Sequence, residues 1–238
     1  MTETAVYLQP AFILQHRRYR ETSLIMDVLT RDFGRISVLA KGVRRARSKT
    51  AGLLQPFIPL AISYVGKAEL KILTDVEITQ PYLELKGTAF YCGYYINELI
   101  SCFLHQYDPH PELFSHYGYC LIGLLDPTKT EAALRNFELH LINNAGYGVQ
   151  LDHDFQNKRP VEPLKKYLFD IELGPIEAEN GSFSGKALCA ISLREFTDPQ
   201  VLSEAKRLMR VVIDFYLQGK PLKSRTMMNN LIKHTKNA

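Results

Sequence analysis

Five short runs of β-type residues fill the first eighty positions, and this pattern constrains the fold more than any other feature. The runs are Val6–Leu14, Ser23–Leu29, Arg35–Ala40, Phe57–Tyr64 and Leu70–Val76, separated by turn or loop residues at His16–Arg20, Asp32–Gly34, Gly42–Gly52 and Gly66–Lys67. Within the third run, Ile36, Val38 and Ala40 alternate with the residues between them, as in a strand with one buried face. Five short strands in so few residues predict a small closed barrel.

After Pro81 the apolar residues adopt helical spacing. The expected helices are Ala89–Leu104, Pro111–Leu125, Thr130–Ala145, Pro199–Leu217 and a last basic helix with Ser224 as its N-cap. Residues 150–193 are broken by prolines and by the turn Glu179–Ser182, which predicts loop plus a small hairpin. We therefore expect an α+β chain of two domains, a five-stranded oligonucleotide-binding (OB) barrel over residues 1–80 and a helical domain over residues 81–238.

Composition narrows the class of protein. The chain has 238 residues, of which 46% are hydrophobic and 23% charged, the balance of a globular protein. No stretch approaches the roughly 18 apolar residues of a membrane span, and Met1–Thr4 does not begin a secretory signal. Four cysteines stand far apart without a C-x-x-C pair, so buried free thiols are expected. We expect a cytoplasmic protein with no membrane partner.

The net charge of +4 hides an uneven distribution. Residues 1–80 carry a net charge of +5, residues 81–193 a net charge of −6, and residues 194–238 a net charge of +5. The densest part, Arg17 to Lys49, holds ten basic residues against three acidic ones. Such a stretch is typical of a surface that binds a polyanion, although a solvated charged face explains it equally well.

Sequence signatures of catalysis are missing. The chain has no H-E-x-x-H, G-x-S-x-G, G-x-x-x-x-G-K-[ST] or G-x-G-x-x-G motif. Asp152-His153-Asp154 offers oxygen and nitrogen ligands, but neighbouring side chains diverge and no distant partner cluster is visible. We expect no enzyme activity, no metal and no cofactor, although a hydrolase with a dispersed site stays open as a third class.

Binding a single strand requires cations for the phosphates and aromatic faces for the bases. Arg17, Arg18 and Arg20 surround Tyr19, whereas Arg31 and Arg35 surround Phe33. The segment after the third run adds the cations Lys41, Arg44, Arg45, Arg47 and Lys49, and the carboxyl-terminal region adds Lys206, Arg207, Arg210, Lys220, Lys223, Arg225 and Lys233. Stacking contributes about 1–3 kcal/mol per base and needs no particular sequence. Partial burial of Tyr19 and Phe33 in the barrel is the alternative interpretation.

The acidic middle suggests a protein partner. Arg135, beside Leu134 and Phe137, is a candidate cation for a partner's acidic, aromatic-ended tail. Pairing of Arg135 with Glu131 or Glu138 on the helix surface is at least as good an interpretation.

Several strings together resemble the RecO family of bacterial recombination mediators. The barrel strings are Arg20-Glu21-Thr22-Ser23, Gly34-Arg35, Ala40-Lys41-Gly42-Val43-Arg44 and Leu54-Gln55-Pro56-Phe57. The helical strings are Tyr95-Ile96-Asn97-Glu98-Leu99, Leu134-Arg135-Asn136-Phe137-Glu138-Leu139, Gly146-Tyr147-Gly148 and Gly219-Lys220-Pro221-Leu222-Lys223-Ser224-Arg225. The resemblance covers nearly the whole chain in order.

This resemblance implies a protein of recombinational DNA repair in the bacterial nucleoid that binds single- and double-stranded DNA and anneals complementary strands. It implies contact with the carboxyl-terminal tail of the single-strand binding protein SSB, for which Arg135 is the candidate, and work with RecR to load RecA. The expected DNA-binding residues are Arg17, Arg18, Arg20, Arg35, Lys41, Arg44, Arg45, Arg47 and Lys49. An RNA-binding or ribosome-associated OB protein is the alternative function.

The chain departs from the family's pattern in one respect. Many relatives carry two C-x-x-C pairs after the G-Y-G string, whereas here the first place reads Leu151 to Asn157 without cysteine and only Cys189 is near the second. A single thiolate does not build a four-ligand zinc site. We therefore expect a degenerate, zinc-free version of a zinc-ribbon-like insert over residues 150–193, held by packing.

Overall fold

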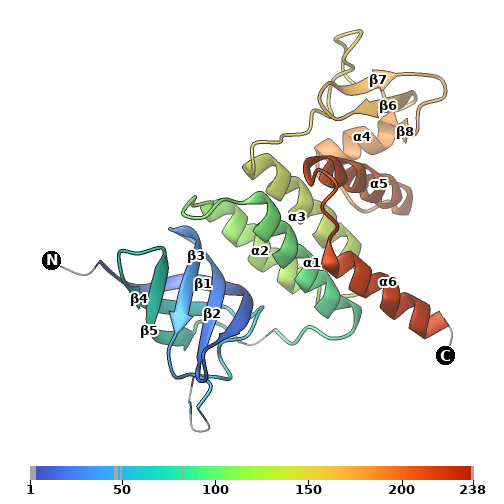
Figure 1. Ribbon diagram of the computed structural model, residues 1–238. Coiled ribbons are helices and arrows are strands. Elements are labelled where there is room, and N and C mark those ends of the chain that lie inside the picture. Colours follow the sequence, from blue (N-terminus) through green and yellow to red (C-terminus); the bar gives the residue numbers. More distant parts are fainter. Residues whose placement is uncertain (1–3, 46–47, 49, 82, 237–238) are drawn as a thin grey trace. The chain divides into compact units, whose positions relative to one another are not determined.

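A computed structural model describes residues 4–45, 48, 50–81 and 83–236, with the backbone alone for Asn229 and residues 231–236. Its contacts form two compact units, Met1–Pro127 with Leu222–Ala238, and Thr128–Pro221. The sequence-based boundary near residue 80 marks the change from strands to helices instead (Figure 1). No helix in the described part of the chain is long and apolar enough to cross a bilayer.

The first unit begins with a closed five-stranded barrel in the order β1-β2-β3-β5-β4, which confirms the predicted fold class. The strands are β1 (Ala5–Tyr19), β2 (Ser23–Thr30), β3 (Gly34–Ala40), β4 (Leu60–Val65) and β5 (Leu70–Ile78). All pairings are antiparallel except the parallel pairing of β3 with β5. As the alternation predicts, Ile36, Val38 and Ala40 lie in the barrel core.

Strand β1 is longer than its sequence pattern indicates. The turn predicted over His16–Arg20 is confined to Arg20–Thr22, because Arg17 pairs with Ile25 and Arg18 with Leu24. The neighbouring strand supplies backbone hydrogen-bond partners to a polar segment whose own residues resemble a loop. Two of the predicted DNA-binding arginines are therefore strand residues with fixed directions.

Three helices complete the first unit: α1 (Thr88–Phe103), α2 (Pro111–Gly123) and α6 (Lys223–Lys236). A buried hydrogen-bond chain ties the barrel to two of them, since Asn97 Nδ2 on α1 donates to the Leu14 carbonyl at 2.7 Å and Tyr117 Oη on α2 donates to Asn97 Oδ1 at 2.7 Å. Phe12 packs edge-on against the Tyr117 ring at 4.8 Å between centroids. The part of β1 around Phe12 and Leu14 is therefore covered by α1 and α2.

The start of α6 corrects the predicted N-cap. The helix begins at Lys223, and the cap is the Glu98 carboxylate of α1, which accepts the Lys223 and Ser224 backbone N–H groups at 2.9 Å each. The Ser224 hydroxyl donates to Glu98 Oε2 at 2.5 Å instead of capping its own helix. A carboxylate at a helix N-terminus offsets both the orphan N–H groups and the helix dipole.

The second unit combines three helices and a small sheet. The helices are α3 (Thr130–Asn144), α4 (Gly185–Ser192) and α5 (Pro199–Tyr216), and the sheet has the order β7-β6-β8, with β6 (Lys166–Asp170), β7 (Gly174–Glu177) and β8 (Phe183–Ser184). Both α3 and α4 pack against α5. The predictions for α3 and α5 agree with the structure to within one residue.

Residues 150–193 contain more structure than the predicted loop and hairpin. The hairpin of β6 and β7 turns at residues 171–173, and the predicted turn at Glu179–Ser182 leads into β8 and the unpredicted helix α4. The Ser184 hydroxyl caps α4 by accepting the Ala187 N–H at 3.2 Å. Short segments such as these owe their form to tertiary packing more than to their own periodicity.

Packing and one buried carboxylate hold this insert together. Tyr167 is 1% exposed, and Asp154 accepts the backbone N–H groups of Asn157 and Glu177 at 2.5 Å each. Cys189 Sγ donates to the Val161 carbonyl at 3.4 Å. The described residues, which include all of 150–193, bring together no three His, Cys, Asp or Glu side chains, so their donors do not fit a zinc ion.

Candidate nucleic-acid interface

One end of the barrel gathers two cationic segments that are distant in the sequence. The turn Arg20–Thr22 after β1 and the segment Lys41–Arg45 after β3 meet because β2 pairs with both strands. The Arg44 backbone N–H donates to the Thr22 carbonyl at 2.9 Å, and the Arg44 guanidinium donates to the Glu21 carbonyl at 3.1 Å. These two hydrogen bonds hold the second segment against the first.

We call this surface the basic rim. Its members are exposed side chains from the end of β1 and from the two segments, namely Arg17, Arg18, Arg20, Lys41, Arg44 and Arg45. No ion pair joins any of them to a carboxylate within the described residues. Six uncompensated cations raise the local concentration of anions. The expected contacts Arg47 and Lys49 lie outside the described residues.

The two aromatic residues singled out by the sequence lie at opposite ends of the barrel. Tyr19 is next to the basic rim, and the Arg20 guanidinium lies 5.3 Å from its ring centroid. Phe33 is in the β2–β3 turn at the other end, 41% exposed, with its ring against Tyr64. Adjacent Arg31 is ion-paired with Asp32 at 2.9 Å. Of the two aromatic–cation groups expected, the structure therefore brings only the one around Tyr19 to the rim.

Arg35 departs from its predicted role as an exposed DNA contact. Its guanidinium is paired with Asp27 at 2.9 Å, and the side chains are 12% and 13% exposed respectively. It also donates to the carbonyls of Ser101 and Leu104 at the end of α1, at 2.7 and 2.8 Å. These hydrogen bonds join β3 to β2 and to the end of α1, so the side chain is part of the scaffold.

The basic carboxyl-terminal region is partly neutralised. Lys206 is paired with Glu131 at 2.7 Å and Arg210 approaches Asp214 at 3.8 Å. Arg207 donates to the Ser182 carbonyl and covers the Phe183 ring at 4.6 Å. This region therefore offers a weaker anion-binding surface than the rim.

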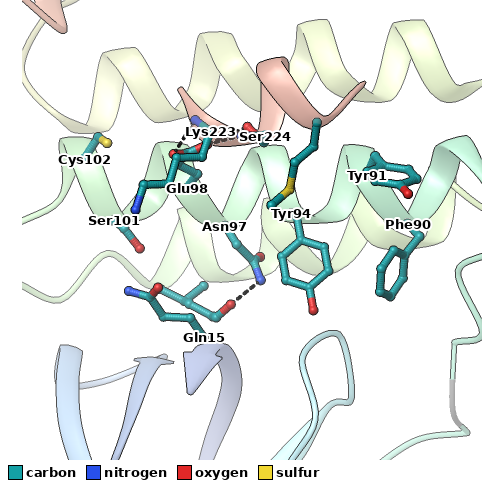
Figure 2. Close-up of a pocket in the computed structure, with 12 residues that line it drawn as sticks. Gln15, Phe90, Tyr91, Tyr94, Asn97, Glu98, Ser101, Cys102, Lys223 and Ser224 are labelled. Atoms are coloured by element: carbon teal, nitrogen blue, oxygen red, sulfur yellow. Dashed lines mark hydrogen bonds between the residues drawn. The ribbon is translucent and has the colours of Figure 1, made fainter. Parts of the chain in front are cut away.

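The first unit also contains an aromatic groove that sequence reasoning missed. Phe90, Tyr91 and Tyr94 of α1 form an aromatic wall, Leu14 and Gln15 of β1 also line the groove, and the groove encloses about 650 Å³ (Figure 2). The rings of Phe90 and Tyr94 meet edge to face at 4.9 Å between centroids. Burial raises the pKa of the Tyr94 hydroxyl above its ordinary value.

The other end of the groove is polar. Lys223 and Ser224 of α6 line this end together with Glu98, whose carboxylate is bonded to the start of α6 as Figure 2 shows. Its negative charge is therefore partly offset by backbone N–H groups. Met227 of α6 adds apolar surface to the groove. The sequence does contain one signal for this groove, the four aromatic residues among positions 90–95. One buried helix face does not accommodate all four, so some of them must lie at the surface.

Arg135 of α3 is buried, with 5% of its surface exposed. Its guanidinium is bonded to Glu138 at 2.7 Å, so the expected pairing occurs with Glu138, but inside the unit and not on its surface. Arg135 Nε has no hydrogen-bond partner among the described residues. The side chain is not the isolated groove cation that the sequence suggested.

Comparison with known proteins identifies the family to which this chain belongs. The family model described as "Recombination protein O N terminal" matches residues 1–82, and "Recombination protein O C terminal" matches residues 85–226. The chain is 41% identical to DNA repair protein RecO of Nitrosospira multiformis, over 92% of this chain and 93% of the relative. It is 41% identical to DNA repair protein RecO of Methylococcus capsulatus, over 94% of each chain, and 40% identical to that of Haemophilus influenzae, over 94% of this chain and 97% of the relative. Together with the closed barrel and the helical part that follows, these matches show that the chain belongs to the RecO family.

Proposed function

We propose that this protein is a non-catalytic mediator of DNA repair and recombination that binds DNA through the basic rim. Family membership supports the role in DNA repair, because the matching relatives are DNA repair proteins. The observation that supports the DNA-binding surface is the meeting, at one end of the barrel, of six exposed cations that form no ion pair with any described residue. Neutralising phosphates releases counterions, which favours binding of any sequence, single- or double-stranded.

Annealing of complementary strands follows from the same chemistry. Two like-charged strands approach when their phosphates are screened, and cations that contact only the backbone leave the bases able to pair. In the full proposal the protein, with RecR, helps RecA to replace SSB on single-stranded DNA in the bacterial nucleoid. Faster pairing of two complementary oligonucleotides, with SSB present and absent, is the direct assay.

Charge reversal at the rim tests the proposal. Arg44→Glu with Arg45→Glu should weaken binding of single-stranded DNA and reduce the slope of log K against log salt by about 1.4, the share of two phosphate contacts. The matched control is Lys158→Glu with Arg159→Glu, an adjacent exposed pair in the second unit. Unchanged affinity and slope in the rim variant would refute the rim as the DNA site. A parallel titration with RNA of the same sequence distinguishes the alternative RNA-binding function.

We further propose that Arg135 receives the acidic tail of SSB. A tail carboxylate would replace Glu138 as the partner of the guanidinium, whose Nε is unpartnered in the described structure. Glu138→Gln should therefore raise the affinity for an acidic, aromatic-ended peptide, and Arg135→Met should lower it about tenfold or more. Arg159→Met is the control for a generic loss of charge. Equal affinities of all three variants, measured by calorimetry, would remove Arg135 from the tail site.

A further inference from the structure

Neither the fold nor the proposed role of the basic rim in DNA binding explains the aromatic groove of the first unit. Its volume of about 650 Å³ lies in the range of about 300–1,000 Å³ typical of ligand sites. Phe90 is 40% exposed and Met227 is 56% exposed, so apolar surface at both sides of the groove faces solvent. We propose that this groove holds unpaired bases of a nucleic-acid strand whose phosphates lie on the basic rim, an inference that rests on the proposed function.

The aromatic wall is rigid enough to act as a stacking surface. Phe90 and Tyr94 are one helical turn apart on α1, and buried Phe57 supports both rings from behind, with centroids 5.9 and 5.3 Å away. Gly93 lets α1 approach this support, since a Cβ there would meet the Phe57 ring at 2.7 Å. Because the rings are held before a base arrives, little side-chain entropy is lost on stacking.

Strand β1 links the groove to the basic rim. Gln15 lines the groove, and side chains two residues apart in a strand point to the same face. Arg17 therefore follows Gln15 along one side of β1, and both are exposed beyond the bulge between Ile13 and Gln15. A nucleic-acid strand whose phosphates lie on the basic rim therefore passes close to the groove, because Arg17 of the rim and Gln15 of the groove are two residues apart on β1.

The charges around the groove favour this occupant. Lys223 lies at its polar end, and helix α6 contains four Lys and Arg residues and no Asp or Glu. The carboxylate of Glu98 is bound by the α6 N-terminus, and that of Asp27 on the neighbouring strand is paired with Arg35. Aromatic faces beside cations, with the carboxylates compensated, are the elements of a sequence-tolerant single-strand site.

The test compares bases with phosphates. Wild-type protein should bind an oligothymidine more tightly than an abasic oligomer with the same number of phosphates. Phe90→Ala should remove about fivefold or more of this preference, the loss of one stacked base, and leave the salt slope unchanged. It should also reduce the fluorescence change of a 2-aminopurine oligonucleotide on binding. The control is Tyr119→Ala, which removes an aromatic ring that is 68% exposed on α2.

The outcomes separate this inference from the proposed function. If Arg44→Glu with Arg45→Glu reduces the salt slope but Phe90→Ala binds oligothymidine and abasic oligomer like wild type, the groove inference fails and the rim stands. If wild-type protein binds neither oligomer, both fail. If an acidic peptide, and not DNA, protects Cys102 at the groove from alkylation, the occupant is a peptide and the inference is overturned.

Discussion

Arg35 and the arginines of the basic rim come from one basic stretch and differ in their surroundings. Arg35 is 12% exposed in its side chain and bonded to Asp27 and to the end of α1, whereas Arg44 and Arg45 are exposed and contact no carboxylate in the described structure. The first arginine joins two elements, and the others leave their charge available. Identical residue types within ten positions thus divide between scaffold and surface according to what packs against each strand.

The largest expected effect is a loss of stability at the buried pair. Arg35→Ala leaves the Asp27 carboxylate without its partner, which should cost about 3–5 kcal/mol of unfolding free energy in a urea titration. Arg35→Met combined with Asp27→Leu removes both charges and should recover most of that loss. If Arg35→Ala unfolds like wild type yet lowers the salt slope of DNA binding, the distinction between the two groups of arginines is wrong.

The smallest expected effect on stability is at the rim. Arg45→Ala should change the unfolding free energy by less than about 0.5 kcal/mol, because an exposed side chain without a partner contributes little. Its effect should appear in DNA binding instead, as a salt slope smaller by about 0.7 for single strands. Loss of stability comparable to that of Arg35→Ala would show that the rim is structural.

Alternation and turn residues were enough to predict the strands and the closed barrel. They failed at the end of β1, where Arg17 and Arg18 look like a loop and become a strand by pairing with β2. They failed again at Arg35, because a sequence does not show which face of β3 a helix will cover. The local pattern decides that Arg35 lies in a strand, but its exposure depends on Ser101, a partner 66 residues away.

The candidate site was only partly visible in the sequence for the same reason. The density of cations identified the rim, since the segments around Arg20 and Arg44 are basic whatever their position. The aromatic groove needs three distant segments, β1, α1 and α6, so helical periodicity predicted the helix Ala89–Leu104 but not the groove beside it. Helix α4 escaped prediction because eight residues give little periodicity, although Ser184 was a readable cap.

The capping of α6 by Glu98 has a consequence for the order in which the chain is made. The cap joins residues 126 positions apart, Glu98 and Ser224. During synthesis the barrel, α1 and α2 emerge long before Lys223, so one end of the groove is added only after the whole second unit has left the ribosome. A translation stop just before Leu222 would therefore yield a chain with a complete rim but an open groove.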